Sequence, residues 1–180
     1  MDWLEQVTQK LKRNNQILFG KDSLILQDLA SLLCHENRRV ITLWAFDLAS
    51  GSVDLLKKRY PGEDRPTQAL CAAQDWAAGR IKMREAQRAI LNCHALAKQL
   101  QHKEDISLCH AIGQACSVVH TTRHALGYPM YDLTATVHRF GVESCTEAII
   151  QRKQEYMDKL FYWNKHADSF QTTWADFMLK

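Results

Sequence analysis

The sequence predicts an all-α protein, a single-domain antiparallel helical bundle with a buried central helix near residues 106–126. Three observations support this fold class. The 180 residues include only seven glycines and three prolines, too few for the many turns of a β-protein. Apolar side chains recur at helical spacing, and the alternation typical of strands is nearly absent. With 46% hydrophobic residues, a chain of this length can bury one core.

The first predicted helices cover residues 24–34 and 37–60, where leucines and other apolar residues recur along one face. Residues 50–52 (SGS) are expected to bend or split the second helix, because glycine and serine weaken a helix interior. Residues 60–66 (YPGEDRP) then break the helix. Pro66 is placed to begin the next one, where its missing N–H does no harm.

Residues 66–101 are predicted to form an antiparallel helical hairpin. The first helix covers about residues 67–78, and Gly79 is placed to end it. The second covers residues 82 to about 101, and its buried face carries Ala89, Cys93, Leu96 and Leu100. Small side chains on both helices permit a close approach. Residues 102–105 (HKED) form the next connection.

Residues 106–142 are predicted to contain the central, most buried helix. This stretch holds only three formally charged residues, Arg123, Asp132 and Arg139, and an interruption is expected near residues 127–129 (GYP). The tail, residues 143–180, is predicted to form one or two closing amphipathic helices. Its aromatic side chains either join the core or mediate homo-oligomer formation; they are Tyr156, Phe161, Trp163, Phe170 and Trp174.

Charge and composition narrow the functional classes. The net charge is only +3, and no basic arm or acidic tail is present, so no nucleic-acid or membrane partner is expected. No apolar run approaches the ~20 residues that cross a bilayer, and the N-terminal residues lack the apolar core of a signal peptide. We therefore expect a cytoplasmic protein with reduced cysteines. Cys71 and Cys116 are expected to pack as small core side chains.

A line of polar residues along the predicted central helix is the first candidate site. At 100° per residue, five of them fall within roughly 40° of one line; they are His110, Gln114, Ser117, Thr121 and His124. His120 lies beside this line. The spacing of His120 and His124 suits two ligands of one metal ion, but the glutamate of an HExxH motif is absent. No metal is predicted; the other interpretation is that the histidines are neutral and hydrogen-bonded in a packed core.

Acidic residues beside arginine or tryptophan form the second group of candidates. In the turn before Pro66, an aspartate lies near the positive end of the next helix, and an arginine offers a planar fork for a carboxylate. The Asp and Trp pairs at 44/47 and 75/76 either line a ligand pocket or satisfy an indole N–H and an arginine in the core. The predicted binding residues are Asp47, Asp64, Arg65, Asp75, Trp76, His94, His120 and His124.

Catalytic signatures are otherwise missing from the sequence. There is no GxSxG motif, no P-loop and no GxGxxG motif, and no cofactor is predicted. Cys93 and His94, like Cys109 and His110, pair a nucleophile with a base in sequence. The side chains of adjacent residues on a helix point about 100° apart, however, so each cysteine would need a base from another part of the chain. The sequence therefore favours a protein without catalytic activity.

A succession of short motifs resembles a known family. These motifs are NRR (37–39), LWAFDLA (43–49), YPGEDRP (60–66), ALCAAQDWAAG (69–79), MREAQRA (83–89), HA (94–95), GQA (113–115), VH (119–120) and HALG (124–127), followed by Tyr131. In this order they resemble the immunity proteins of bacterial polymorphic-toxin systems, in the type-five-like group, over roughly residues 35–135. The resemblance implies a small helical protein that binds and blocks a cognate protein toxin.

Three functions therefore stay open. The first is a non-catalytic binding protein that occludes a toxin and needs only a rigid scaffold with an exposed patch. The alternative is a metal- or small-ligand-binding helical enzyme or sensor. It would be built around His120 and His124, with a carboxylate or a histidine from packed helices completing the site. The third is a regulatory or oligomeric helical module that self-associates through the tail aromatics named above.

Overall fold

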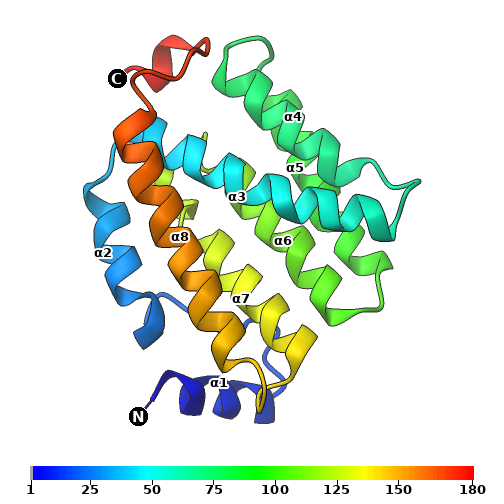
Figure 1. Cartoon of the computed structure of the whole chain (residues 1–180). Helices are drawn as coiled ribbons and strands as arrows, with labels where there is room; N and C mark the ends of the chain where they lie inside the picture. Colours follow the sequence, from blue (N-terminus) through cyan, green and yellow to red (C-terminus); the bar gives the residue numbers. More distant parts are fainter. Residues whose placement is uncertain (1) are drawn as a thin grey trace.

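The computed structural model describes residues 2–180, and in this range it contains eight α-helices, four short 3₁₀ helices and no strand, which confirms the all-α fold class (Figure 1). The α-helices are α1 (Trp3–Lys12), α2 (Gln27–His35), α3 (Arg38–Arg59), α4 (Arg65–Ala77), α5 (Met83–Leu96), α6 (Lys103–Ser117), α7 (Gly127–Phe140) and α8 (Thr146–His166). The 3₁₀ helices are η1 (Leu24–Leu26), η2 (Ala97–Gln99), η3 (Thr122–His124) and η4 (Asp176–Met178).

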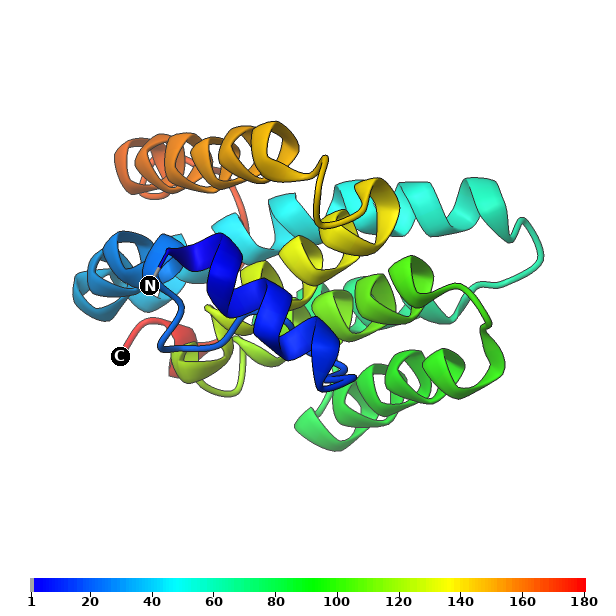
Figure 2. The same cartoon turned by 90° about the horizontal axis from the view of Figure 1, so that it is seen from below.

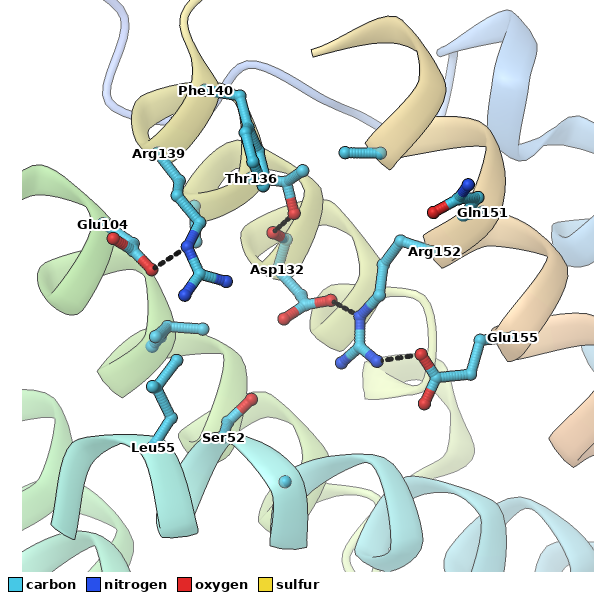
Figure 3. A pocket seen from close by; sticks show the side chains of 14 residues that line it. Ser52, Leu55, Glu104, Asp132, Thr136, Arg139, Phe140, Gln151, Arg152 and Glu155 are labelled. Carbon is cyan, nitrogen blue, oxygen red and sulfur yellow. Dashed lines mark hydrogen bonds and ion pairs between the residues drawn. The ribbon is translucent and has the colours of Figure 1, made fainter. Parts of the chain in front are cut away.

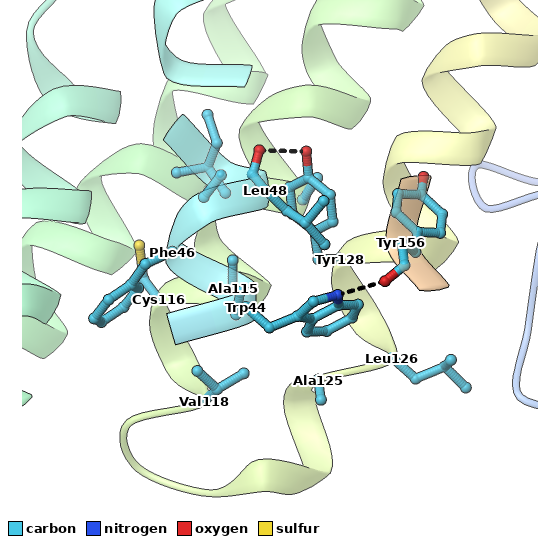
Figure 4. Packing of buried hydrophobic residues seen from close by; sticks show 14 of the residues in the cluster. Trp44, Phe46, Leu48, Ala115, Cys116, Val118, Ala125, Leu126, Tyr128 and Tyr156 are labelled. Carbon is cyan, nitrogen blue, oxygen red and sulfur yellow. Dashed lines mark hydrogen bonds between the residues drawn. The ribbon is translucent and has the colours of Figure 1, made fainter. Parts of the chain in front are cut away.

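Helix α3 runs without a break through Gly51, so a split of the helix at residues 50–52 is wrong. The helix begins at a capped residue, because the side chain of Asn37 accepts a hydrogen bond from the backbone N–H of Val40. Buried side chains lie along its whole length, and this packing outweighs the cost of one glycine, about 1 kcal/mol. Trp44 is completely buried and donates its indole N–H to the carbonyl oxygen of Tyr156 at 2.9 Å (Figure 4).

The hairpin of α4 and α5 forms as predicted. Pro66 lies in the first turn of α4, and Gly79 follows the end of the helix at a φ of +76°, a left-handed conformation that suits glycine. Ala69, Ala73 and Ala86 are completely buried between the packed helices. Helix α5 ends at Leu96, before the predicted residue 101, because the chain tightens into η2.

Helix α6 is the buried central helix, since it packs against α3, α4, α5 and α7. It ends at Ser117, however, and residues 118–126 form turns and η3, so one helix over 106–126 is wrong. The predicted interruption at residues 127–129 is also misplaced, because these residues begin α7. Pro129 lies in the first turn of α7, where a backbone N–H would have no partner within the helix, so its absence loses no hydrogen bond. A proline at this position begins a helix, and the break between α6 and α7 therefore lies before it.

Helix α8 crosses α3, and the tail folds back over the end of α4 (Figure 1). The backbone N–H of Ala175 donates to the carbonyl oxygen of Ala77 at 2.8 Å, and Arg38 donates to that of Phe177 at 3.0 Å. The tail aromatics divide between core and surface: Tyr156 is buried, whereas Phe161 is 56% exposed. Self-association through them remains a prediction.

Helix α1 lies across one face of the bundle (Figure 2). Its hydrophobic face packs Val7 into the same buried cluster that contains the apolar residues of the other helices. The chain then passes residues 14–16 next to side chains of α5, α6 and α7. Among residues 2–180, no helix is both long and apolar enough to span a membrane.

Candidate functional site

An open groove lies between α3, α6, α7 and α8, and it is the candidate functional site (Figure 3). Its volume is about 380 Å³. The base of the groove holds a buried polar network, and its rim carries charged side chains and an exposed aromatic ring. The polar side chains that carry the argument are Ser52, Glu104, Asp132, Arg139, Arg152 and Glu155.

A buried ion pair joins α7 to α8 at the base of the groove. Asp132 is only 4% exposed, and its Oδ2 accepts a hydrogen bond from Nε of Arg152 at 2.6 Å. The same oxygen accepts the hydroxyl proton of Tyr156. Arg152 also pairs with Glu155 at the rim. The carboxylate therefore has a charged partner and a neutral donor, as a buried charge requires.

Tyr128 completes this network with a fully satisfied hydroxyl group. It donates to the carbonyl oxygen of Leu48 at 2.9 Å. It lies 2.7 Å from Ser52 Oγ and accepts from Nη2 of Arg152 at 3.0 Å. Because Tyr128 has one proton, the serine hydroxyl is the donor in their contact. Helices α3, α7 and α8 are thus held together by one polar network.

Burial and neighbouring charges in this network shift the pKa values of Arg152, Tyr128 and Tyr156. Burial lowers the pKa of Arg152, but the Asp132 carboxylate together with the oxygens of Tyr128 and Tyr156 raises it by more, so the net shift is upward. Burial, followed by the charge of Asp132, raises the pKa of Tyr128 and of Tyr156. Both phenols therefore stay protonated at neutral pH and act as hydrogen-bond donors or acceptors, not as bases.

The rim of the groove presents chemistry suited to protein recognition. Phe140 is 48% exposed, and the guanidinium of Arg139 lies 5.6 Å from the centre of its ring. Glu104 receives a hydrogen bond from Arg59 at 2.9 Å and lies 3.6 Å from Arg139. An arginine and an aromatic ring beside charges of both signs are typical of protein interfaces.

One feature of the sequence points to this site. Asp132 was one of three charges in an otherwise uncharged stretch, and a lone acid on a buried helix needs a cationic partner. Arg152 lies 20 residues further on, in a tail predicted only to be amphipathic, so the pair depends on tertiary packing of α7 against α8. Ser52, Tyr128 and Tyr156 carried no local signal.

The predicted Asp and Trp residues lie outside the groove. Asp47 accepts hydrogen bonds from Nζ of Lys159 at 2.5 Å and from the indole of Trp163 at 2.9 Å, so it joins α3 to α8. Asp75 accepts from Arg80 at 2.8 Å at the end of α4. The buried Trp76 stacks on His120, with ring centres 6.3 Å apart.

In the turn before α4, Asp64 lies at the helix start and Arg65 binds a carboxylate, as predicted, but that carboxylate belongs to the neighbouring Glu63. Asp64 precedes the helix, but its carboxylate makes no capping hydrogen bond with the backbone. Arg65 binds Glu63, donating from Nε at 2.8 Å and from Nη2 at 2.6 Å, and also reaches Gln99 at 2.8 Å. The planar fork of Arg65 is therefore occupied by a neighbouring carboxylate.

The predicted polar line is broken, because α6 ends at Ser117 and His120 and His124 do not share a helix. The helical i, i+4 arrangement of these two histidines is therefore wrong. His124 donates to the side-chain oxygen of Gln114 at 2.9 Å. Gly127 permits this contact, since an added Cβ would lie 2.5 Å from that oxygen. Among residues 2–180, no three His, Cys, Asp or Glu side chains form a group suited to a metal.

His94 finds its partner on the next helix instead. Its Nδ1 lies 2.9 Å from Nδ1 of His110, and the ring of His110 packs against Tyr131 with centres 5.1 Å apart. His94 also covers Gly113, where a Cβ would lie 2.2 Å from its Nε2. Burial lowers the pKa of His94 to about 4 and lowers that of His110.

The two Cys-His couples do not form nucleophile-base pairs in this arrangement. The Cys93 thiol donates to the backbone carbonyl of Cys109 at 3.6 Å, and both cysteines are buried. Contact with Cys93, followed by burial, raises the pKa of the Cys109 thiol. Cys116 is buried as expected, but Cys71 is exposed, because it lies on the outer face of α4.

The sequence model of one protein family, described as Imm-5 like putative immunity protein, matches residues 31–159. The chain belongs to this family. No curated protein and no solved structure matches it. The matched range of this Imm-5 like protein starts in α2 and ends inside α8, so it extends beyond the likeness over residues 35–135. Every residue that lines the groove falls within it.

Proposed function

We propose that this protein is a non-catalytic immunity protein that binds and neutralises a cognate bacterial protein toxin in the cytoplasm. The observation that carries this proposal is the family match over residues 31–159. A protein with this role needs a rigid surface complementary to its toxin, and it needs no reactive group.

The groove between α3, α7 and α8 is the proposed contact site for the toxin. It is built entirely from the family-matched range. The ion pair of Asp132 and Arg152 and its tyrosine partners fix the helices below the rim. Side chains on such a fixed base lose less conformational entropy on binding. Arg139 and Phe140 at the rim are the side chains that would enter the toxin surface.

Co-expression tests the proposal. The probe is the toxic domain encoded beside the gene for this protein, produced with and without this chain in a sensitive bacterial host. We expect the chain to restore growth and to form a stable complex with that domain. Failure of the unaltered chain to protect or to bind would contradict the immunity function.

Variants of the rim test the contact site separately. The double change Arg139→Glu and Phe140→Ala should weaken toxin binding by about 30-fold or more, as expected for interface hot spots. The matched control is Arg88→Glu with Phe161→Ala, which alters the same residue types at exposed positions elsewhere. Full protection by the rim variant would contradict the groove as the contact site and leave the immunity function standing.

A further inference from the structure

A second pocket lies on the other side of α7, where residues 11–16 pass over α5, α6 and α7. Its volume is about 510 Å³, within the range of small-molecule sites. His94, His110 and Tyr131 form one wall, and the apolar side chains of Leu11 and Ile106 form part of another. The N-terminal segment is needed to close it, and this segment lies outside the family-matched range.

The formally charged side chains that line this pocket are all positive. Lys98 and Lys103 line it, and among its described lining residues none is acidic. The nearest acids in sequence are Glu104 and Asp105, but both form ion pairs with Arg59, and Asp105 also accepts a hydrogen bond from Tyr60 at 2.6 Å. Their charges are therefore already compensated, so the lysines face the pocket without a carboxylate partner inside it.

The His94–His110 pair can change its protonation state, and with it the number of N–H donors and the charge beside the lysines. One Nδ1 of the His94–His110 contact must carry a proton and the other must accept it. In the neutral pair, the ring that accepts at Nδ1 carries its proton on Nε2. Gain of one further proton leaves the Nδ1 contact intact and gives both rings an Nε2–H group. The pair can therefore add a positive charge to the pocket without breaking its own hydrogen bond.

We propose that this pocket binds a small organic anion, one that carries a carboxylate or phosphate group on an apolar body. The lysines and His110 would contact the anionic group, because Nε2 of His94 already faces Gly113. Leu11, Ile106 and the ring of Tyr131 would contact the body. The first five residues of α6 also contribute to the pocket lining through Lys103, Ile106 and Ser107, and the start of a helix favours negative charge. This function is independent of toxin binding.

Binding of such an anion depends on pH. Groups from every surrounding element face the histidine pair: Lys98 after α5, Lys103 on α6, His124 in η3, Tyr131 and His138 on α7, and the neutral amides of Asn14 and Asn15. In the free protein, burial lowers the pKa of both rings and so favours their neutral form. A bound anion stabilises the imidazolium form, so affinity should rise as the pH falls from 8 to 5, with uptake of a proton.

Calorimetry on the full chain tests this proposal with benzoate and phenyl phosphate as probes, at constant ionic strength in chloride. Benzyl alcohol and benzylammonium are the neutral and cationic comparisons. We expect at least one anion to bind, to shift the imidazole NMR signals of His94 and His110, and to bind more tightly at pH 5 than at pH 8. The two comparison compounds should bind at least about tenfold more weakly.

Charge reversal at the exposed lysines locates the site. Lys98→Glu with Lys103→Glu should weaken anion binding by about tenfold or more. The matched control is Lys57→Glu with Lys165→Glu, which makes the same change in net charge at exposed positions away from the pocket. Equal weakening in both variants, equal affinity for the neutral compound, or no binding by either anion would overturn the proposal.

Discussion

Replacing Asp132 with asparagine removes the charge at the centre of the α7–α8 network while almost keeping its volume. In the native protein the carboxylate accepts from Arg152 at 2.6 Å and from the hydroxyl of Tyr156. Asparagine retains one acceptor oxygen for the tyrosine. It leaves the guanidinium without its principal counter-charge, in a site where the aspartate is only 4% exposed.

The loss of unfolding free energy in Asp132→Asn depends on the partners and the solvent exposure that Arg152 keeps. Loss of one partner from a buried ion pair costs about 3–5 kcal/mol of unfolding free energy. Arg152 keeps Glu155 as a partner, and its side chain is 24% exposed, so water screens part of the uncompensated charge. We expect a loss of about 3 kcal/mol, at the lower end of that range. Since small proteins unfold with about 5–15 kcal/mol, the variant should remain folded but close to its limit.

Urea unfolding followed by tryptophan fluorescence measures this loss, because the buried Trp44 becomes exposed on unfolding. The control is Glu155→Gln, which should cost less than about 0.5 kcal/mol because Glu155 lies at the exposed rim. The double variant Asp132→Asn with Arg152→Met should lose less than the sum of the single losses, since it leaves no unpaired buried charge. A loss below about 1 kcal/mol for Asp132→Asn, or strict additivity, would refute this reasoning.

Three further outcomes are expected. Gly113→Ala should reduce thermal stability by about 1–3 kcal/mol, because the new methyl group overlaps the ring of His94; an unchanged melting temperature would contradict this. Trp44→Phe should cost about 2 kcal/mol in urea unfolding, since it removes the indole donor to Tyr156 and leaves a void. The pKa of His94 is near 4 in the folded protein, below its usual value. The unfolded chain therefore binds the proton first, and stability should fall as the pH drops from about 6.5 to about 4. Unfolding curves of His94→Gln should show a weaker dependence on pH in this window.

Local signals in the sequence predicted most of the helices, but α1 (Trp3–Lys12) was missed. Apolar periodicity located α3, and Gly79 and Pro66 marked the ends of the α4 region. The helix boundaries predicted for residues 106–142 were wrong. The low charge of this stretch indicated that it is buried, but it did not show where the helix ends. Pro129 suggests an interruption in the sequence, but a proline near a helix start is favourable, so the break lies upstream of it.

The candidate site could be predicted only in part, since its contacts join residues that are distant in sequence. Asp132 was recognisable as an isolated charge, but its partner Arg152 was not. His94 and His110 are on separate helices, 16 residues apart, and their contact depends on the packing of α5 against α6. Asp47 and Trp163 are 116 residues apart. The type of each residue suggested polar chemistry, whereas the choice of partner depends on the packing of the helices.

Helix α7 separates the two candidate sites and contributes consecutive residues to each. Asp132 and Arg139 face the groove, whereas Tyr131 and His138 line the pocket beside residues 11–16. Neighbouring residues on a helix point about 100° apart, so one helix can serve both surfaces without sharing a side chain. The groove lies within the family-matched range, and the pocket needs a segment outside it. Variants at Arg139 should therefore impair toxin binding and spare anion binding.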